Sequence, residues 1–358
     1  MILKEDKPLL SICIPTYNRA KYLDRLLAEI LAPCEKLGIR VLISDNGSTD
    51  NTQSILEKYK AHSNLCCFRN NRNEGFDFNV LILLKHVSSQ YIWLMGDDDV
   101  FDVGYLPKII ELINKYPDFG MMYLDHDLQD NNMPASLPVK DPLQYLIVDQ
   151  QAYCDQVLHR ATLMSANIIN ANYFACDMID PACMGKKWLH VHILLRIADK
   201  LATTETKNII VGEKIFRQRT GTVDEKVFVL WFIDYFLETI SLSNVTAINL
   251  DVFMNKFYTL AVRGSLLEMG WKNSFAQSWQ CFRRARGKFG IPIYDTIIFI
   301  FTTSVYRFIG PKRLRYFKNL FFLKQIMFFF RGNLINKKTH QNKAMIADGA
   351  SLFEATRR

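Results

Sequence analysis

The first 125 residues alternate short apolar runs with stretches whose apolar residues recur at helical spacing. The runs are rich in Val, Ile, Leu and aromatic side chains, which is typical of buried strands. The strands predicted in this way span 9–14, 39–44, 65–68, 91–95 and 119–124. The helices predicted between them span 21–31, 52–61, 78–87 and 105–115. This alternation predicts an α/β fold built from right-handed βαβ units, with a mainly parallel sheet flanked by helices.

The pattern changes after residue 125. The stretch 125–149 is polar and contains three prolines, so it is predicted to be a long loop. A strand-like run at 163–169 and a helical stretch at 188–198 follow, and from 227 onward the pattern is helical and aromatic-rich. We therefore expect an α/β domain at 1–222, a helical region at 223–331 and a polar, flexible tail at 332–358.

Polar clusters follow three of the predicted strands. They occupy 16–19 (Thr-Tyr-Asn-Arg), 45–50 (Asp-Asn-Gly-Ser-Thr-Asp) and 97–99 (Asp-Asp-Asp). Ligands of parallel α/β sheets bind at the carboxyl ends of the strands, where the loops gather. The three clusters are therefore expected along one edge of the sheet. Taken alone, 45–50 is also explained as an Asx turn followed by helix-capping residues.

Three adjacent aspartates repel one another unless a positive group neutralises them. A hard divalent cation, Mg²⁺ or Mn²⁺, prefers oxygen ligands and shares them with substrate phosphates. The alternative is a solvated acidic loop that caps the next helix. Neither GxGxxG after the first strand nor GxxxxGK[ST] occurs, which argues against a Rossmann dehydrogenase or a P-loop enzyme.

Four segments follow one another along the first 100 residues: 11–19 (SICIPTYNR), 42–52 (LISDNGSTDNT), 71–75 (NRNEG) and 93–100 (WLMGDDDV). As a set they closely resemble glycosyltransferase family 2, which has the GT-A fold. The resemblance covers about 8–125 well, is thinner from 160 to 220 and is absent beyond that. The Gly-Asp-Asp-Asp variant is most similar to the abequosyltransferase-like branch of O-antigen sugar transferases.

The resemblance implies a role for each matching residue. The segment after the first strand lies against the nucleotide, Asp45 contacts the base, and Arg72 and Gly75 belong to a segment that closes over the nucleoside. Asp98 aligns with the metal ligand, with Asp99 beside it, and Asp97 and Asp99 share the ribose and supporting roles. Gly96 stands where the family commonly has its first Asp. The implied nucleotide-sugar residues in this part of the chain are Pro15, Thr16, Tyr17, Asn18, Arg19, Asp45, Arg72, Gly75 and Asp97.

Inverting members of the family use a general base, normally an Asp on a helix after the sixth strand. The matching position here is His190, whose ordinary pKa near neutrality suits proton transfer. His192, Asp125 and Asp127 are alternatives, and the histidines are equally explained as polar positions of an amphipathic helix. Two further residues, Arg217 and Arg219, suit a diphosphate clamp on a mobile loop, although surface solvation explains them too.

The net charge of +8 is concentrated near the C-terminus. Residues 296–347 contain ten basic side chains and no Asp or Glu, which leaves 34 basic and 36 acidic residues elsewhere. Charged residues interrupt the apolar stretches 291–309 and 314–330, so neither is a transmembrane helix. Basic and aromatic residues together favour helices at 291–331 that lie on an anionic membrane surface. No nucleic-acid-binding motif is present, and a helical interface in a homo-oligomer is the other alternative.

Eight cysteines without a CxxC pair indicate reduced thiols, and the N-terminus lacks the features of a signal peptide. We therefore expect a cytoplasmic protein at the inner face of the plasma membrane. The resemblance implies a Mg²⁺- or Mn²⁺-dependent, inverting transfer from a nucleotide-sugar to a polyprenyl-diphosphate-linked saccharide. The rivals are a sugar-nucleotide nucleotidyltransferase and a non-catalytic nucleotide-sugar-binding scaffold protein.

Overall fold

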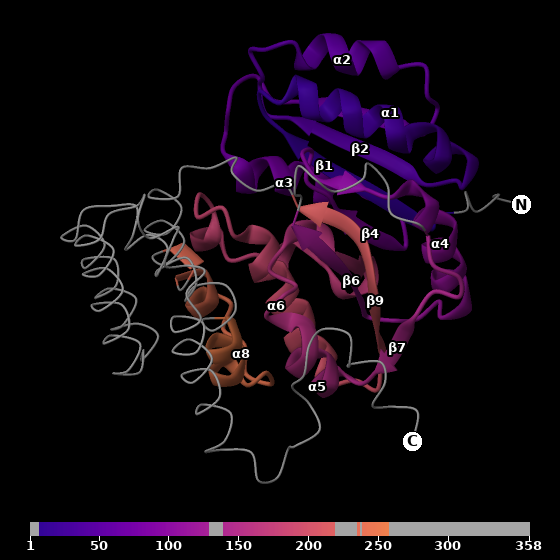
Figure 1. Ribbon diagram of the computed structural model, residues 1–358. Coiled ribbons are helices and arrows are strands. Elements are labelled where there is room, and N and C mark those ends of the chain that lie inside the picture. Colours follow the sequence, from indigo (N-terminus) through magenta and orange to yellow (C-terminus); the bar gives the residue numbers. More distant parts are fainter. Residues whose placement is uncertain (1–6, 129–138, 219–234, 237, 258–358) are drawn as a thin grey trace, which may run out of the picture. The chain divides into compact units, whose positions relative to one another are not determined.

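A nine-stranded mixed sheet runs through the chain, with helices on its faces (Figure 1). The structure is a computed structural model, and it describes residues 7–128, 139–218, 235–236 and 238–257. The chain divides into two units, 1–262 and 263–358, and every element named below belongs to the first. The path of the sheet is β3-β2-β1-β4-β8-β6-β9-β5, and β7 pairs with β9.

The first half of the sheet is parallel, as predicted. Its strands are β1 (Leu10–Thr16), β2 (Arg40–Asp45), β3 (Leu65–Arg69) and β4 (Tyr91–Leu94). Every residue of β1 and β4 is buried, because helices cover both faces here and each strand reads as a continuous apolar run. The carboxyl ends of all four strands therefore lie at one edge of the sheet, where their loops meet.

Helices cover both faces of this half. Helix α1 (Ala20–Lys36) packs beside α2 (Thr52–Tyr59), while α3 (Phe76–His86) packs on β1 and β2 and touches α6 (Leu189–Leu201) (Figure 1). The buried positions of α1 follow the helical period, from Leu23 through Leu27 to Cys34. Further α-helices in the described part of the chain are α4 (Leu106–Lys115), α5 (Gln150–Tyr153) and α8 (Leu250–Phe257), and residues 238–242 are also helical. Short 3-10 or π turns span Val103–Tyr105, Cys154–Leu158, Met164–Ala166, Ala171–Tyr173, Cys176–Met178 and Pro181–Cys183.

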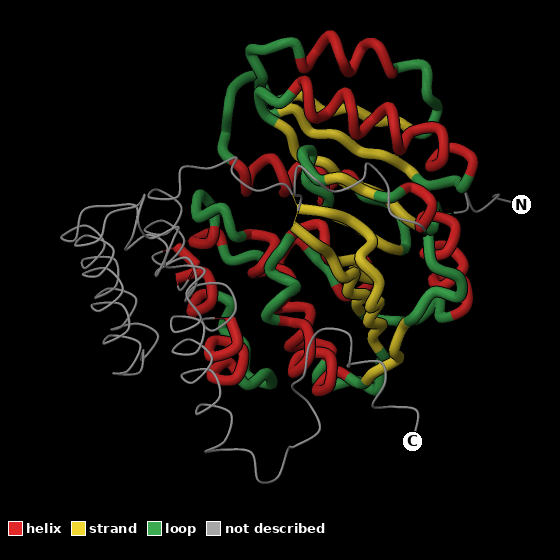
Figure 2. Tube along the Cα trace, viewed as in Figure 1, coloured by secondary structure: helices red, strands yellow, loops and turns green. Residues whose placement is uncertain are grey.

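The second half of the sheet is mixed, and here several predictions need correction. Its strands are drawn in yellow in Figure 2. Its strands are β5 (Val100–Phe101), β6 (Met121–Leu128), β7 (Tyr145–Val148), β8 (Asn167–Asn170) and β9 (Asn208–Gln218). Strand β8 is antiparallel to β4 and β6, and β9 is parallel to β6 but antiparallel to β5 and β7. The predicted loop 125–149 contains the end of β6 and the whole of β7, and the run 163–169 becomes a strand only at Asn167.

The predicted divisions after 222 and 331 fall outside the described residues and stay predictions, as do the helices expected at 291–331. Of the described part of 223–331, residues 238–242 are helical and residues 250–257 form α8. Among the described residues, no helix combines the length and the apolarity that a membrane span requires.

Candidate active site at the carboxyl edge of the sheet

The loop after β1 and the loop after β4 are joined by hydrogen bonds and ion pairs. Thr16, the last residue of β1, donates from Oγ1 to Oδ2 of Asp97 at 2.7 Å. The Arg19 guanidinium lies 3.2 Å from Oδ1 of Asp97 and also forms an ion pair with Asp98. The structure thus brings together residues of two loops that lie 78 to 81 positions apart in the sequence, and a side-chain cation already lies against the triplet.

Burial sets the protonation of Asp97. Removal from water raises the pKa of this carboxyl to about 6, and the nearby Arg19 and the Thr16 hydroxyl oppose that rise. Through its contacts with Thr16 and Arg19, Asp97 holds the two loops together. Because its side chain is only 6% exposed, it has little surface left for a ligand.

Asp98 is the accessible member of the triplet. Its side chain is 17% exposed, and the Arg25 guanidinium of α1 donates to the backbone carbonyls of Asp98 and Asp99 at 3.2 Å each. The chain around Asp98 is therefore fixed through its backbone, while its partly exposed carboxylate pairs with Arg19. This supports the alignment of Asp98 with the family's metal ligand, a role that stays a prediction.

Asp99 is held by a residue that sequence reasoning missed. Ser165 donates from Oγ to Oδ2 of Asp99 at 2.5 Å and accepts the backbone N–H of Gly96 at 2.9 Å. A Cβ at Gly96 would lie 3.1 Å from Oδ2 of Asp99 and 3.3 Å from Oδ1 of Asp98. A side chain in place of Gly96 would crowd both carboxylates, which is a physical reason for the departure from the family pattern. The only sequence signal for Ser165 was a polar residue inside an apolar run.

The donor set suits a hard cation with help from a substrate. In the described part of the chain, no group of three or more Asp, Glu, His or Cys side chains is arranged to hold a metal by itself. Mg²⁺ is commonly bound by one or two carboxylates and completed by substrate phosphates and water. An accessible Asp98 beside the buried Asp97 and Asp99 fits that pattern. A metal here would compete with Arg19 for Asp98.

The second loop is built as an Asx turn. Asp45 is fully buried at the end of β2, where Oδ1 accepts the backbone N–H of Ser48 at 2.9 Å and Oδ2 accepts from Gln53 at 2.5 Å. The contact between Asp45 and the base of the nucleotide stays a prediction. Ser48 in turn accepts the backbone N–H of Asn18 at 2.8 Å, and Asn18 accepts the N–H of Thr49 at 2.8 Å. The first and second loops are thereby locked together.

Two other residues of the first loop differ in exposure. Pro15 is buried inside β1, whereas Tyr17 is 38% exposed. The ring of Tyr17 is therefore open to stack on a planar ligand, while Pro15 shapes the strand beneath it.

The third loop, 70–75, is fixed by Asn46. Its amide donates to Asn73 Oδ1 at 2.8 Å and to the Gly75 carbonyl at 3.1 Å, and its oxygen accepts the N–H of Glu74 at 3.0 Å. Gly75 has φ 92° and immediately precedes α3, a conformation that glycine adopts without strain. The Arg72 side chain is 79% exposed and pairs with Glu74 at 2.7 Å. Both predicted residues thus lie at this edge of the sheet, with Arg72 facing solvent.

His190 is buried in the first turn of α6. Its Nε2 lies 2.9 Å from the Thr162 carbonyl, which fixes the proton on Nε2 and leaves Nδ1 as the lone-pair atom, and Nδ1 has no hydrogen-bond partner. Burial lowers the pKa of His190 to about 4. The imidazole is therefore neutral at pH 7 and a weaker base than an exposed histidine. Its role as a base stays a prediction.

The segment around Thr162 connects His190 to the aspartates. Thr162 contacts His190 through its carbonyl, and Ser165, three residues later, holds Asp99. His190 therefore belongs to the same network as the triplet.

Two of the alternative general bases, His192 and Asp125, already have hydrogen-bond or ion-pair partners. Both ring nitrogens of His192 have partners, Ser243 on Nδ1 at 2.9 Å and the Met178 carbonyl on Nε2 at 3.2 Å. Asp125 pairs with Lys214 at 2.7 Å and with Arg160 at 3.3 Å. Asp127 lies in β6, paired in register with Arg217. Of His190, His192 and Asp125, His190 alone keeps an unpartnered basic atom, and that atom is buried in the ligand-free protein.

The position of Arg217 differs from the one predicted for a diphosphate clamp. Arg217 lies in strand β9, 3% exposed, and not on a mobile loop. It pairs in register with Val100, the residue directly after the triplet, so it is close to the site along the sheet. Arg219 lies outside the described residues.

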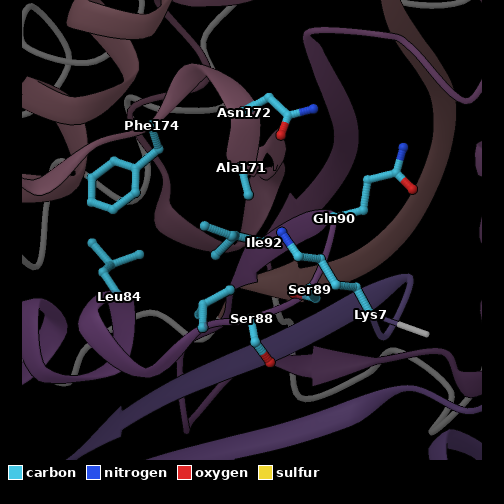
Figure 3. A pocket seen from close by; sticks show the side chains of 10 residues that line it. Lys7, Leu84, Ser88, Ser89, Gln90, Ile92, Ala171, Asn172 and Phe174 are labelled. Carbon is cyan, nitrogen blue, oxygen red and sulfur yellow. The ribbon is translucent and has the colours of Figure 1, made fainter. Parts of the chain in front are cut away.

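A separate cavity of about 420 Å³ lies at the opposite edge of the sheet (Figure 3). It is lined by Ser88, Gln90 and Ile92 at the start of β4 and by Asn172 and Phe174, among others. The triplet follows the other end of β4. This cavity is therefore not part of the candidate active site.

Comparisons with known proteins agree with this geometry. Residues 11–159 match the model of the family described as Glycosyl transferase family 2, and these residues include all three loops and the triplet. The abequosyltransferase RfbV of Salmonella typhimurium is 41% identical over 203 residues, which cover 53% of this chain and 61% of that protein. An uncharacterized glycosyltransferase of Rickettsia prowazekii is 25% identical over 167 residues, 45% of this chain and 51% of that protein. The chain thus spans less than two thirds of the length of these relatives.

Among solved structures, that of S. aureus TarS 1-349 in complex with UDP superposes with a TM-score of 0.54. Sequence identity is 15%, and the match covers 78% of this chain and 80% of that one. At this identity the likeness concerns the fold alone. The architecture is that of the GT-A glycosyltransferases, as the sequence motifs predicted.

Proposed function

We propose that this chain, which carries a glycosyltransferase family 2 domain at 11–159, transfers a sugar from a nucleotide-sugar to a lipid-linked saccharide. The acceptor proposed is polyprenyl-diphosphate-linked, as in O-antigen synthesis, and the similarity to an abequosyltransferase supports this class. One observation carries the proposal. Thr16 and Arg19, from the loop after β1, converge on Asp97 and Asp98 at the end of β4.

The diphosphate of the donor would lie against this cluster. Asp98, with Asp99 beside it, would hold Mg²⁺ or Mn²⁺, and the ion would neutralise charge that develops on the departing diphosphate. Arg19, already paired with Asp97 and Asp98, is placed to turn one or more N–H groups toward phosphate oxygens when an ion takes over the carboxylate. Arg217 is proposed to contribute a second positive charge from β9.

The nucleoside would lie across the three joined loops. The exposed ring of Tyr17 offers a face for stacking, and Asp45 lies at the floor of the second loop. Arg72 and Gly75 are proposed to close over the nucleoside, because the loop that carries them is anchored at Asn46 and the Arg72 side chain, paired with Glu74, is 79% exposed. Hydrogen bonds already join the three loops, which supports binding of the nucleoside without a large rearrangement.

On the acceptor side, an inverting transfer forms a bond from an acceptor hydroxyl to the anomeric carbon while the bond to the diphosphate breaks. The hydroxyl proton must pass to a base. We assign this to Nδ1 of His190, because Nε2–H is directed at the Thr162 carbonyl. Its pKa of about 4 leaves the His190 imidazole neutral at pH 7, the form that can accept a proton.

The test is a screen of nucleotide-sugars by thermal stabilisation and by metal-dependent hydrolysis of the donor. Stabilisation by one nucleotide-sugar with Mn²⁺, and release of the nucleoside diphosphate, are expected. Asp98→Asn should reduce turnover at least about 100-fold with the melting temperature preserved. Asp24→Asn is the matched control, since Asp24 is a surface residue paired with Lys58. If no nucleotide-sugar binds in the presence of Mn²⁺, the proposal is wrong.

The same assay separates the rivals. A nucleotidyltransferase would consume a nucleoside triphosphate and a sugar phosphate and would release pyrophosphate. A non-catalytic binding protein would bind the donor equally well before and after Asp98→Asn and would not hydrolyse it. His190→Ala tests the base: near-normal turnover of that variant would exclude His190.

A further inference from the structure

Helix α6 begins without a capping side chain from its own segment. Its N-cap residue, Trp188, makes no side-chain hydrogen bond to the helix backbone, and Lys187 before it has φ 63°. The first backbone N–H groups of a helix have no partner within the helix and need an external acceptor. In α6 this matters for function, because the second residue of the helix is His190.

Asp77 supplies the missing acceptor from another helix. Its Oδ2 accepts the backbone N–H of Lys187 at 2.7 Å, and its Oδ1 accepts that of Leu189 at 3.1 Å. Asp77 lies in the first turn of α3, 110 residues earlier in the sequence. A negative charge at this position is also favourable toward the helix dipole of α6. One carboxylate therefore fixes the backbone on either side of the start of α6.

The contact is buried and costly to make. Asp77 is 1% exposed, and burial raises the pKa of its carboxyl in spite of the backbone N–H groups that favour the charged form. A carboxylate kept in such a place must have its oxygens satisfied. Sequence reasoning missed Asp77, because an acidic residue in a first helical turn is ordinary on its own.

Helix α3 reaches the His190 side chain as well. The ring of Phe76, the first residue of α3, packs edge to face against the His190 imidazole, with 5.9 Å between the two ring centroids. Gly75, just before it, ends the loop 70–75, whose backbone is held by Asn46. The N-terminus of α3 thus links the loop expected over the nucleoside to the residue expected at the acceptor, through both side chain and backbone.

We propose that Asp77 is a positioning residue that fixes His190 relative to the loop 70–75 and so couples donor binding to the acceptor side. The assignment of loop and base rests on the proposed function. The competing explanation is that Asp77 only stabilises the fold as a helix cap. Asp149 offers the matched control, since its side chain caps α5 by accepting the backbone N–H of Ala152 at 2.8 Å.

The experiment follows the His190 side chain by NMR in the full chain labelled with ¹⁵N-histidine, its signal assigned by loss in His190→Gln. In the unmodified chain, His190 should keep its Nε2–H tautomer and titrate near pH 4, in line with its pKa of about 4. In Asp77→Ala the first turn of α6 is released, so the pKa of His190 should rise by at least about one unit toward its ordinary value. Asp149→Ala should leave His190 unchanged. A His190 signal in Asp77→Ala that titrates as in the unmodified chain overturns the proposal.

The second arm adds UDP, CDP, GDP and dTDP, each with Mg²⁺. The diphosphate that binds should move the His190 signal in the unmodified chain and in Asp149→Ala. In Asp77→Ala it should bind within about threefold of the original affinity yet leave that signal in place, and an equal movement would contradict the coupling. If Asp77→Ala does not fold, Asp77→Asn takes its place, because it keeps one acceptor oxygen and should give an intermediate rise in the pKa of His190. If no diphosphate binds the unmodified chain, the proposed function fails, while the ligand-free titration still decides the role of Asp77.

Discussion

At the scale of single residues, Arg19 is the cation that the aspartate triplet needs. It contacts two of the three carboxylates, Asp97 and Asp98, and Asp98 is also the predicted metal ligand. Removing Arg19 leaves the carboxylates without their counter-charge, and it also removes the competitor of a metal ion. We therefore predict that Arg19→Ala lowers the melting temperature without metal and binds Mn²⁺ more tightly, by about threefold or more. Thermal unfolding across a Mn²⁺ titration measures both effects.

The control for Arg19 is Arg40→Ala, because Arg40 is an exposed residue at the start of β2 and contacts Ser88 at the far edge of the sheet. It should leave the Mn²⁺ response unchanged. Equal or weaker Mn²⁺ binding by Arg19→Ala would mean that Arg19 and the ion do not share Asp98.

Gly47 is the second residue whose role can be isolated. It has φ 72°, and a Cβ there would lie 2.6 Å from the backbone carbonyl carbon of Arg72, so the second and third loops pack backbone against backbone. Gly47→Ala should lower the free energy of unfolding by at least about 3 kcal/mol, from left-handed strain and the clash together. Urea unfolding monitored by circular dichroism provides the measurement.

Gly38→Ala is its matched control. Gly38 has φ 67° but no atom within 4 Å of a built Cβ, so alanine there should cost only the strain, about 1 kcal/mol. Similar losses for the two variants would show that the contact with Arg72 adds nothing.

At the scale of elements, one side chain caps two helices. Asp50 accepts the N–H of Ala20 at 3.0 Å, at the start of α1, and the N–H of Thr52 at 3.0 Å, at the start of α2. Neither helix has a side-chain cap from its own N-cap residue. We predict that Asp50→Ala lowers the free energy of unfolding by about 2 kcal/mol, roughly twice a single cap. Chemical denaturation is the measurement, and Asp149→Ala, which removes one cap only, should lose about half as much.

The elements also show how far sequence reasoning reaches. Strands β1, β2 and β4 were predictable, because strands buried on both faces read as continuous apolar runs. The edge strand β3 is only half-buried, and its short apolar run at 65–68 was enough to predict it. Strand β9 was missed, because Gly212-Glu213-Lys214 interrupts its apolar pattern and it buries Glu213 and Arg217, which a pattern of apolar residues cannot reveal. At the site, the polar residues were predictable from their places after strands. Their partners were not: the bonds of Asp77 and Ser165 span 110 and 66 residues and depend on tertiary packing.

At the scale of the whole molecule, buried histidines should make the fold sensitive to acid. Burial lowers the pKa of His126, His159 and His190 to about 4 each. Between the ordinary value near 6.5 and pH 4, the unfolded chain binds protons that the folded chain does not. Stability is therefore fully present above about pH 6.5 and is lost as pH falls toward 4, by up to about 3 kcal/mol for each fully buried histidine.

His159→Gln isolates one of these contributions, since His159 is 7% exposed and lies outside the candidate site. Urea unfolding at pH 5, 6 and 7 should show a slope against pH that is smaller by up to about 1.4 kcal/mol per pH unit in the variant. An unchanged slope in His159→Gln would contradict the assignment.

The basic region near the C-terminus leads to the last prediction, which rests on the sequence because residues 296–347 lie outside the described part. Each Lys or Arg near an anionic membrane surface contributes about 1 kcal/mol of attraction. Replacing Lys312, Arg313, Arg315, Lys318 and Lys324 by Gln should therefore weaken binding to phosphatidylglycerol vesicles by more than about 100-fold. The same number of replacements at exposed positions of the α/β domain, Lys21, Lys36, Lys58, Lys60 and Lys85, changes the net charge equally and should leave sedimentation with vesicles intact. Equal loss in the two variants would assign binding to net charge alone. Retained sedimentation in both would exclude the basic region as a membrane contact and favour the alternative of an interface between copies of the chain, which analytical ultracentrifugation without lipid would then detect.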